Sequence, residues 1–329
     1  MGVAPYLTKV MFEKRLGNFL PHLLLVGLLI SSLSSIAQKD TTINVNKKVV
    51  TLKEVVVRSH LDVPSFIDRV KNDTSFLKAF KNLRILGYTA LNDIRMLDKN
   101  NHEKASLQSR TVQTVQHGCR SMQTYEQKTT GDIFDRNGNY NYYTLQMYAS
   151  LFWVKDTVCG ENNIVADEDF SFKNKSGLEK HKQQLKMLIF NPGRKIPGIP
   201  FMGDKTALFD DNLADYYDFI IDMDQLNGDW CYIFTIKARE DLTAGQRDKI
   251  VINNMTTWFN QGTMEVVKRN YDLSYDAGVY DFNVQIEAEL KKFGEYLVPT
   301  VMRYTGEWDV VFKKKERAIF TATLYDFRK

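Results

Sequence analysis

The sequence has few of the residues that mark several classes of protein. Its 329 residues include only 7 Pro, 18 Gly and 3 Cys. These counts exclude collagen-like and low-complexity chains, and they exclude a small scaffold held together by several disulfides. An excess of one charge is also lacking, because 44 Lys and Arg stand against 40 Asp and Glu for a net charge of +4. We therefore expect no nucleic-acid partner, which would need a stronger basic footprint.

The motifs of common catalytic and cofactor sites are absent as well. The chain contains no GxSxG, no HExxH or HxH, no P-loop and no dinucleotide-binding fingerprint. Seven aspartates lie between Asp204 and Asp224, but Leu226 and Gly228 do not fit a calcium loop. That stretch is typical of a solvated acidic face. We predict no enzymatic activity, no catalytic residues, no metal and no cofactor. One type of site would escape this search, because the two carboxylates of a glycosidase are defined by their distance in space and not by their spacing in the sequence.

The first 37 residues have the three parts of a secretory signal peptide. Lys14 and Arg15 precede an apolar stretch from Phe19 to Ile30, and small residues follow up to Ala37. The stretch is short for a membrane span, which favours cleavage before Gln38 over an uncleaved anchor. We therefore predict an exported protein, in the periplasm or associated with the outer membrane.

All three cysteines, Cys119, Cys159 and Cys231, lie in the exported part. They allow at most one intramolecular disulfide, whose pairing the sequence leaves open. Because no CxxC pair occurs, small buried thiols on strands are a better interpretation than a metal or redox site.

The last hundred residues alternate between apolar and polar side chains over several long segments. From Tyr280 to Leu290 every second residue is apolar, and Met302 to Phe312 and Phe320 to Leu324 repeat the pattern. Such alternation predicts antiparallel strands with one buried face. Short turns at 276–278, 292–294 and 313–316 predict that successive strands are hairpin neighbours.

The first half predicts a mixture of helices and strands. Residues 66–81 and 177–190 have helical apolar spacing, whereas 86–96 and 105–117 have strand spacing, with turns at 98–101 and 135–139. The aromatic-rich segment 140–158 continues this predicted meander. Residues 51–57 predict a short strand after a flexible lead-in. The expected division is a leader (1–37), a lead-in with a short strand (38–60) and one domain (61–329).

These elements predict a β-rich α+β fold, with a strongly curved antiparallel sheet, or incomplete barrel, covered by a few helices. A transmembrane β-barrel is the rival architecture for such alternation. We favour the covered sheet because the two predicted helical segments interrupt the hairpins.

An apolar loop rich in Pro and Gly follows the second predicted helix, over residues 191–205. It carries Ile196, Ile199, Phe201 and Met202. The loop either caps the core or forms the mouth of a hydrophobic cavity. In the second case these four residues are the predicted ligand-binding residues.

The segment TTWFNQGTMEVVKRNYDLSY (256–275) and the meander after it resemble the LolA/LppX-like superfamily of bacterial lipoprotein and lipid carriers. The layout of that superfamily covers residues 66–327. In addition, TLKEVVV (51–57) resembles the end of carboxypeptidase-regulatory-like domains in Bacteroidetes envelope proteins. The first resemblance implies a half-barrel that binds lipid, and the second implies a Bacteroidetes-type exported protein.

Two hypotheses of function follow. The first is non-catalytic binding of a lipophilic ligand, an acyl chain or a lipoprotein, between helix and sheet. The second is a structural or interaction module among envelope proteins, whose interior is filled by its own aromatic side chains.

Overall fold

The computed structural model describes residues 40–45, 48–59, 61–165, 187, 189–190, 193, 204–276, 280–310 and 315–329. These residues all belong to one compact unit, Asp40–Lys329. The predicted leader and its cleavage point before Gln38 lie outside the described residues, as does most of the helix predicted over 177–190. The domain boundaries drawn from the sequence stay predictions.

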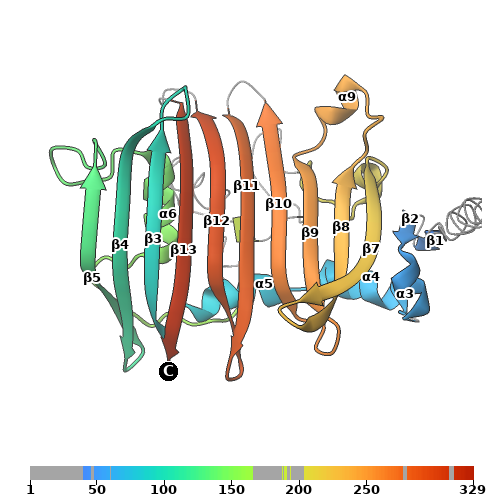
Figure 1. The fold of residues 1–329 in the computed structure, drawn as a ribbon, viewed down its shortest axis with the longest axis horizontal. Coiled ribbons are helices and arrows are strands. Elements are labelled where there is room, and N and C mark those ends of the chain that lie inside the picture. Colours follow the sequence, from blue (N-terminus) through green and yellow to red (C-terminus); the bar gives the residue numbers. More distant parts are fainter. Residues whose placement is uncertain are drawn as a thin grey trace, which may run out of the picture. The chain divides into compact units, whose positions relative to one another are not determined.

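Within the described residues, the strands form one open 13-stranded sheet, which Figure 1 shows face-on. Its strands in spatial order are β1 (Thr41–Val45), β2 (Lys48–Leu52), β7 (Tyr217–Leu226), β8 (Asp229–Ala238), β9 (Ile252–Asn260), β10 (Val266–Asp276), β11 (Tyr280–Phe293), β12 (Tyr296–Val310), β13 (Glu316–Arg328), β3 (Gly87–Leu97), β4 (Glu103–Gln116), β5 (Cys119–Thr130) and β6 (Thr157–Cys159). The predicted fold class, a β-rich open sheet with few helices, is confirmed.

Two long-range pairings join the sheet into one piece. The last strand, β13, inserts between β12 and β3, so the C-terminal hairpins are continuous with the β3–β4–β5 meander. On the other side, β2 pairs with β7 in parallel, while the remaining neighbours are antiparallel. Alternation with short turns predicts which consecutive strands are hairpin neighbours, but it does not predict either of these pairings, because they join strands that are far apart in the sequence.

The predicted alternation is confirmed strand by strand. On β11, Phe282, Val284 and Ile286 are buried on one face, which we call the inner face. The opposite face, the outer face, carries Asn283 and Gln285. On β10, a β-bulge after Val266 shifts the alternation locally and places Val266, rather than Val267, in the core.

The longer helices lie on the inner face (Figure 1). They are α4 (Val63–Asn72), α5 (Ser75–Asn82) and α6 (Tyr143–Phe152), and the shorter ones are α3 (Glu54–Arg58), α8 (Asp211–Ala214) and α9 (Ala244–Arg247). Figure 1 shows α6 behind β3 and β13 and apart from α4 and α5. Phe66 of α4 packs its ring edge-on against Tyr232, Phe234 and Phe259, at centroid distances of 5.8, 5.9 and 5.4 Å. Edge-on aromatic contacts of this kind stabilise the helix layer on the sheet.

The predicted single helix over 66–81 is wrong in one respect, because Asp73 divides it into α4 and α5. Its Oδ1 accepts hydrogen bonds from the backbone N and the Oγ of Ser75, at 3.2 and 2.6 Å. Its Oδ2 lies 3.9 Å from Nη2 of the buried Arg269 on β10. A carboxylate bound in this way competes with helix continuation, and it ties the junction of the two helices to the sheet.

Two further predictions from the first half need correction. Val55, Val56 and Val57 are helical, in α3, although β-branched residues favour strands. Val56 is only 1% exposed, so its burial outweighs that intrinsic preference. Residues 41–45 and 48–52, part of the predicted lead-in segment 38–60, form strands β1 and β2.

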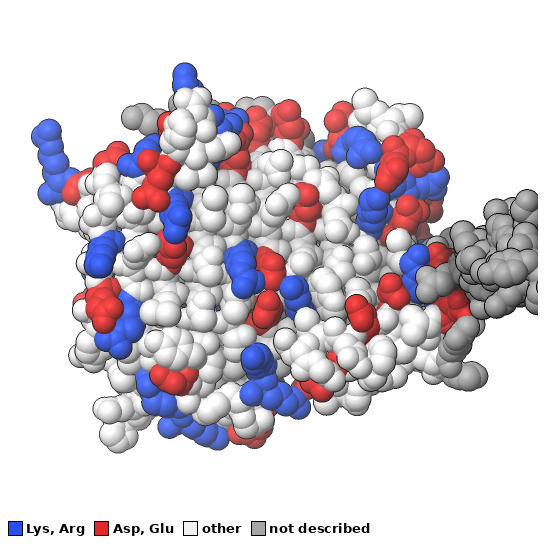
Figure 2. All heavy atoms as spheres, in the orientation of Figure 1, with Lys and Arg blue, Asp and Glu red and all other residues white. Residues whose placement is uncertain are grey.

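Charged side chains on the outer face pair across strands. Nζ of Lys268 lies 2.9 Å from Oε1 of Glu287, and Nη1 of Arg303 lies 2.7 Å from the same oxygen. Figure 2 shows this face, where the two signs of charge are interspersed over a mostly uncharged surface. Within the described residues, no helix is long and apolar enough to cross a membrane.

Candidate functional site

A cleft of about 860 Å³ lies on the inner face between the sheet and α6. Strands β4 and β5 form one wall, α6 forms the opposite wall, and the loop 131–142 and the segment 153–155 close the ends. Its lining residues are Ser109, Met122, Thr124, Gln127, Phe134, Asp135, Gly138, Asn139, Tyr140, Gln146, Ala149, Ser150, Trp153, Val154 and Lys155. The volume is in the range of small-molecule sites.

Aromatic rings form the apolar part of the lining. The ring centroids of Phe134 and Tyr140 are 5.3 Å apart, and those of Tyr140 and Trp153 are 5.6 Å apart. Trp153 also contacts Tyr148 edge-on at 5.2 Å. Met122 completes this surface from β5. The cleft therefore offers apolar surface to a hydrocarbon chain beside its polar lining groups.

The loop 131–142 owes its shape to two local features. Oδ1 of Asp135 accepts hydrogen bonds from the backbone N of Asn137 and of Asn139, both at 2.8 Å, and Phe134 forms a β-bridge with Tyr140. This confirms the turn predicted at 135–139. The loop begins at Gly131, which has φ +65° and lies so close to the backbone of Lys104 that a side chain would clash.

A distant carboxylate holds the start of α6. Oε1 of Glu316 accepts a hydrogen bond from the backbone N of Tyr143 at 2.8 Å, and Oε2 accepts from the backbone N and the Oγ1 of Thr144, both at 2.9 Å. The N-cap residue, Tyr142, provides no side-chain cap of its own. Since a negative charge at a helix N-terminus is favourable, Glu316 of β13 fixes the helical wall of the cleft to the sheet.

A buried polar network fixes the middle of α6. The hydroxyl of Tyr148 donates to Oδ1 of Asn92 at 2.6 Å, and Nδ2 of Asn92 donates to Oγ of Ser109 at 3.1 Å and to Oγ1 of Thr111 at 3.3 Å. Burial raises the pKa of Tyr148 well above its ordinary value, so the phenol stays a donor. Asn92, the residue that interrupts the apolar pattern of β3, thus serves to position α6.

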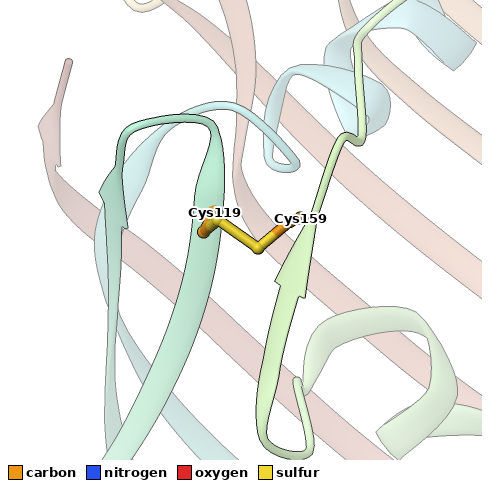
Figure 3. Close-up of a disulfide and its surroundings, with 2 residues drawn as sticks. All are labelled: Cys119 and Cys159. Atoms are coloured by element: carbon orange, nitrogen blue, oxygen red, sulfur yellow. A yellow bond between two sulfur atoms is a disulfide. The ribbon is translucent and has the colours of Figure 1, made fainter.

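A disulfide between Cys119 and Cys159 joins β5 to β6 (Figure 3). It corrects the interpretation of these two cysteines as buried thiols, which holds only for Cys231. Because β5 lines the cleft and β6 follows Trp153–Lys155 directly, the bond ties one wall of the cleft to the segment that closes its end.

The polar groups of the cleft suit binding. Its lining includes hydroxyls, amides, one basic residue, Lys155, and one acidic residue, Asp135. The backbone N–H groups of the turn, that of Asn139 above all, lower the pKa of Asp135. This carboxylate therefore stays ionised to hold the turn and is a poor general acid.

The predicted ligand-binding residues Ile196, Ile199, Phe201 and Met202 lie outside the described residues, so the proposed mouth stays a prediction. The aromatic segment 140–158 is predicted from the sequence to continue the strand meander, and this prediction is wrong for most of it. In the structure, residues 143–152 form α6, and only this helix brings Gln146, Ala149 and Ser150 to the cleft. The sequence does contain a sign of this helix, because Tyr143, Met147 and Leu151 are spaced four residues apart and so lie on one helical face.

A second cleft, of about 470 Å³, lies where β10 ends, β11 begins and β12 ends. Five carboxylates line it, from Asp248, Asp276, Asp281, Glu307 and Asp309, together with Arg247 and Lys315. Within the described residues, no group of three or more His, Cys, Asp or Glu is arranged to hold a metal ion. The aromatic cleft is the larger of the two.

No protein-family model and no curated protein matches the chain. Among solved structures, a DUF1329 family protein from Desulfovibrio piger is 10% identical, with 78% of this chain and 93% of that chain covered and a TM-score of 0.25. A domain assigned to outer membrane lipoprotein sorting, from Vibrio parahaemolyticus, is 11% identical, with 75% and 88% covered and a TM-score of 0.26. A Rhodopseudomonas blastica porin mutant is 11% identical, with 73% and 99% covered and a TM-score of 0.17.

A Bacteroidetes origin stays a prediction.

Proposed function

We propose that this protein is an exported, non-catalytic binding protein whose aromatic cleft takes the acyl chain of a lipophilic ligand. The observation that carries the proposal is the cleft of about 860 Å³ between helix and sheet, with Phe134, Tyr140 and Trp153 along its lining. The polar groups beside these rings suit the polar end of an amphiphile. Each methylene that leaves water for the cleft contributes about 0.8 kcal/mol.

The cleft is also pre-organised. Glu316 caps α6, Asn92 binds Tyr148, and the disulfide joins the strand wall to the end of the cleft. A site whose walls are fixed before binding loses less conformational entropy when the ligand enters.

Two observations support export. The leader has the order of a signal peptide, and disulfides persist in oxidising compartments such as the bacterial periplasm. A periplasmic or outer-membrane-associated location gives the protein access to lipids and to lipoproteins, the ligands that we propose.

The second candidate function is a structural or interaction module among envelope proteins. It is favoured by close aromatic packing at the centre of the inner face, where Tyr304 and Phe320 stack at 4.5 Å and Phe282 and Trp308 lie 4.9 Å apart. This region is filled by its own side chains. The two functions therefore differ in one point, namely whether the cleft beside α6 holds a ligand.

Displacement of a fluorescent fatty acid tests the proposal. Ala149 lines the cleft from α6, so Ala149→Trp fills the cleft without removing a core side chain. Lys78→Trp, at an exposed position of α5, is the matched control. We expect the wild type and Lys78→Trp to bind the probe and release it, chemically unchanged, to unlabelled lipid, and Ala149→Trp to lose binding. Equal affinity of all three proteins would exclude the cleft as the site, and absence of binding to the wild type would favour the structural module.

A further inference from the structure

Strand β5 has a long edge that its neighbour leaves unpaired. It spans the 12 residues Cys119–Thr130, but β6 pairs only with Cys119, Arg120 and Ser121. Beyond these residues, within the part of the chain that the structure describes, no strand pairs with this side of β5. All residues from Gln123 to Thr130 are exposed, and Figure 1 shows β5 at the margin of the sheet. Unpaired backbone groups on such an edge are a template for another strand.

The charges on this edge are arranged so that the strand complements itself. Glu126 and Lys128 flank Gln127, and because side chains alternate along a strand they lie on the same face. That is the outer face, where Glu126 lies 3.0 Å from Nη2 of Arg110 while its side chain stays 73% exposed. A lysine alone on an edge keeps identical strands apart, but here an opposite charge lies two residues away.

We propose that two copies of this chain associate through β5, in antiparallel pairing with Gln127 opposite Gln127. In this register Glu126 of each copy faces Lys128 of the other, which gives two opposite-charge pairs related by the two-fold axis. Tyr125, whose side chain is 58% exposed, lies beside these pairs on the edge that becomes covered. The occupant of the edge is thus a second copy rather than an unrelated peptide, because the strand's own charge order complements itself.

The pairing also bears on the aromatic cleft. Thr124 and Gln127 line the cleft from β5, so the strand of the second copy continues its wall on the open side. A two-fold axis through Gln127 keeps the inner faces of both copies on the same side of the joined sheet. The association goes beyond the proposed function and does not depend on it, since it rests on the edge and its charges.

Sedimentation velocity over a range of protein concentrations tests the proposal, with the mature chain as the sample. We expect the wild type to dimerise and Lys128→Glu to be monomeric, because two like-charged pairs replace two opposite ones. Glu126→Lys alone should be monomeric for the same reason. Each variant should weaken association by about tenfold or more.

Mixing the two variants gives the decisive result. On this edge the Lys128→Glu variant has glutamate at both positions 126 and 128, and the Glu126→Lys variant has lysine at both. In the mixture each glutamate faces a lysine, so a heterodimer should form although neither variant dimerises alone. Lys99→Glu, which makes the same charge change at an exposed turn, is the control and should dimerise like the wild type. A monomeric wild type, a dimeric Lys128→Glu or a mixture that stays monomeric would each overturn the proposal, and circular dichroism confirms that the variants are folded.

Discussion

Removing the disulfide between Cys119 and Cys159 should destabilise the protein through its unfolded state. The bond closes a loop with a sequence separation of 40 residues. In the chain-entropy model, a loop of that length lowers the entropy of the unfolded chain enough to stabilise the fold by about 4 kcal/mol near room temperature. The double variant Cys119→Ser/Cys159→Ser removes both thiols and therefore measures this term without leaving a reactive cysteine.

The consequence for the cleft is separable from the loss of stability. The bond ties β5, with Met122 and Thr124, to the segment that follows Trp153–Lys155. Without it, the end of the cleft is held by fewer contacts and more entropy is lost on binding. We expect weaker binding of a fluorescent fatty acid under conditions in which the double variant is still folded.

Urea unfolding of the oxidised wild type and the double variant, followed by far-UV circular dichroism, measures the effect on stability. Reduced wild type lacks the disulfide but keeps both cysteine side chains, so it controls for the effect of the serine substitutions. It should unfold at the same urea concentration as the double variant. If the oxidised and reduced wild type unfolded at the same urea concentration with equal slopes, the cross-link would not constrain the unfolded chain and the reasoning would fail.

Three further predictions concern single residues. Glu316→Ala removes the acceptor of three hydrogen bonds at the start of α6. It should lower the free energy of unfolding in urea by about 1.5 to 3 kcal/mol and weaken ligand binding. A decrease of less than about 0.5 kcal/mol would show that other contacts hold α6 in place. Gly306→Ala places a methyl group against the hydroxyl of Tyr304 and should cost about 1 to 3 kcal/mol, measured as a lower melting temperature; an unchanged melting temperature would contradict this close approach. Burial lowers the pKa of Lys81 from 10.5 to about 8, so the unfolded state binds more protons between these pH values and the free energy of unfolding should rise with pH there. Lys81→Met should reduce this rise of the free energy of unfolding with pH. If wild type and Lys81→Met showed the same pH dependence, the rise would not come from Lys81.

The alternating strands were predictable because each buries one face and exposes the other. For β11, the buried Phe282, Val284 and Ile286 are separated by polar residues, so the period is visible in the sequence itself. The pairing of β13 with β3 was not predictable, because residues such as Phe320 and Ile94 are opposite each other but lie far apart in the chain. Their alternation would be the same with any antiparallel neighbour.

Helix boundaries were harder to predict, since contacts distant in sequence decide them. Asp73 ends α4 because its carboxylate binds Ser75 and lies near Arg269. Likewise, α6 starts at Tyr143 because Glu316, a residue of another element, caps it. The hydrogen bonds from Ser75 to Asp73 are local, but the approach of Arg269 to Asp73 and the capping of α6 by Glu316 join residues far apart in the chain, so these two contacts have no local sequence signature.

The candidate site was predictable only in part. The sequence shows the aromatic segment that contains Tyr140 and Trp153, both of which line the cleft. The cleft also needs Met122 and Gln127 from β5, which reach it only through strand pairing. The residues chosen from the sequence, Ile196, Ile199, Phe201 and Met202, stay an independent prediction of the mouth.

Photocrosslinking with a fatty acid that carries a diazirine in its chain tests the central claim most directly. After irradiation of the mature protein, peptide mass spectrometry locates the attached lipid. We expect labels within 122–127, 134–140 and 146–155, all of them reduced by excess unlabelled fatty acid and absent in Ala149→Trp. Labelling that is confined to other segments, or that excess fatty acid does not reduce, would contradict binding in the aromatic cleft.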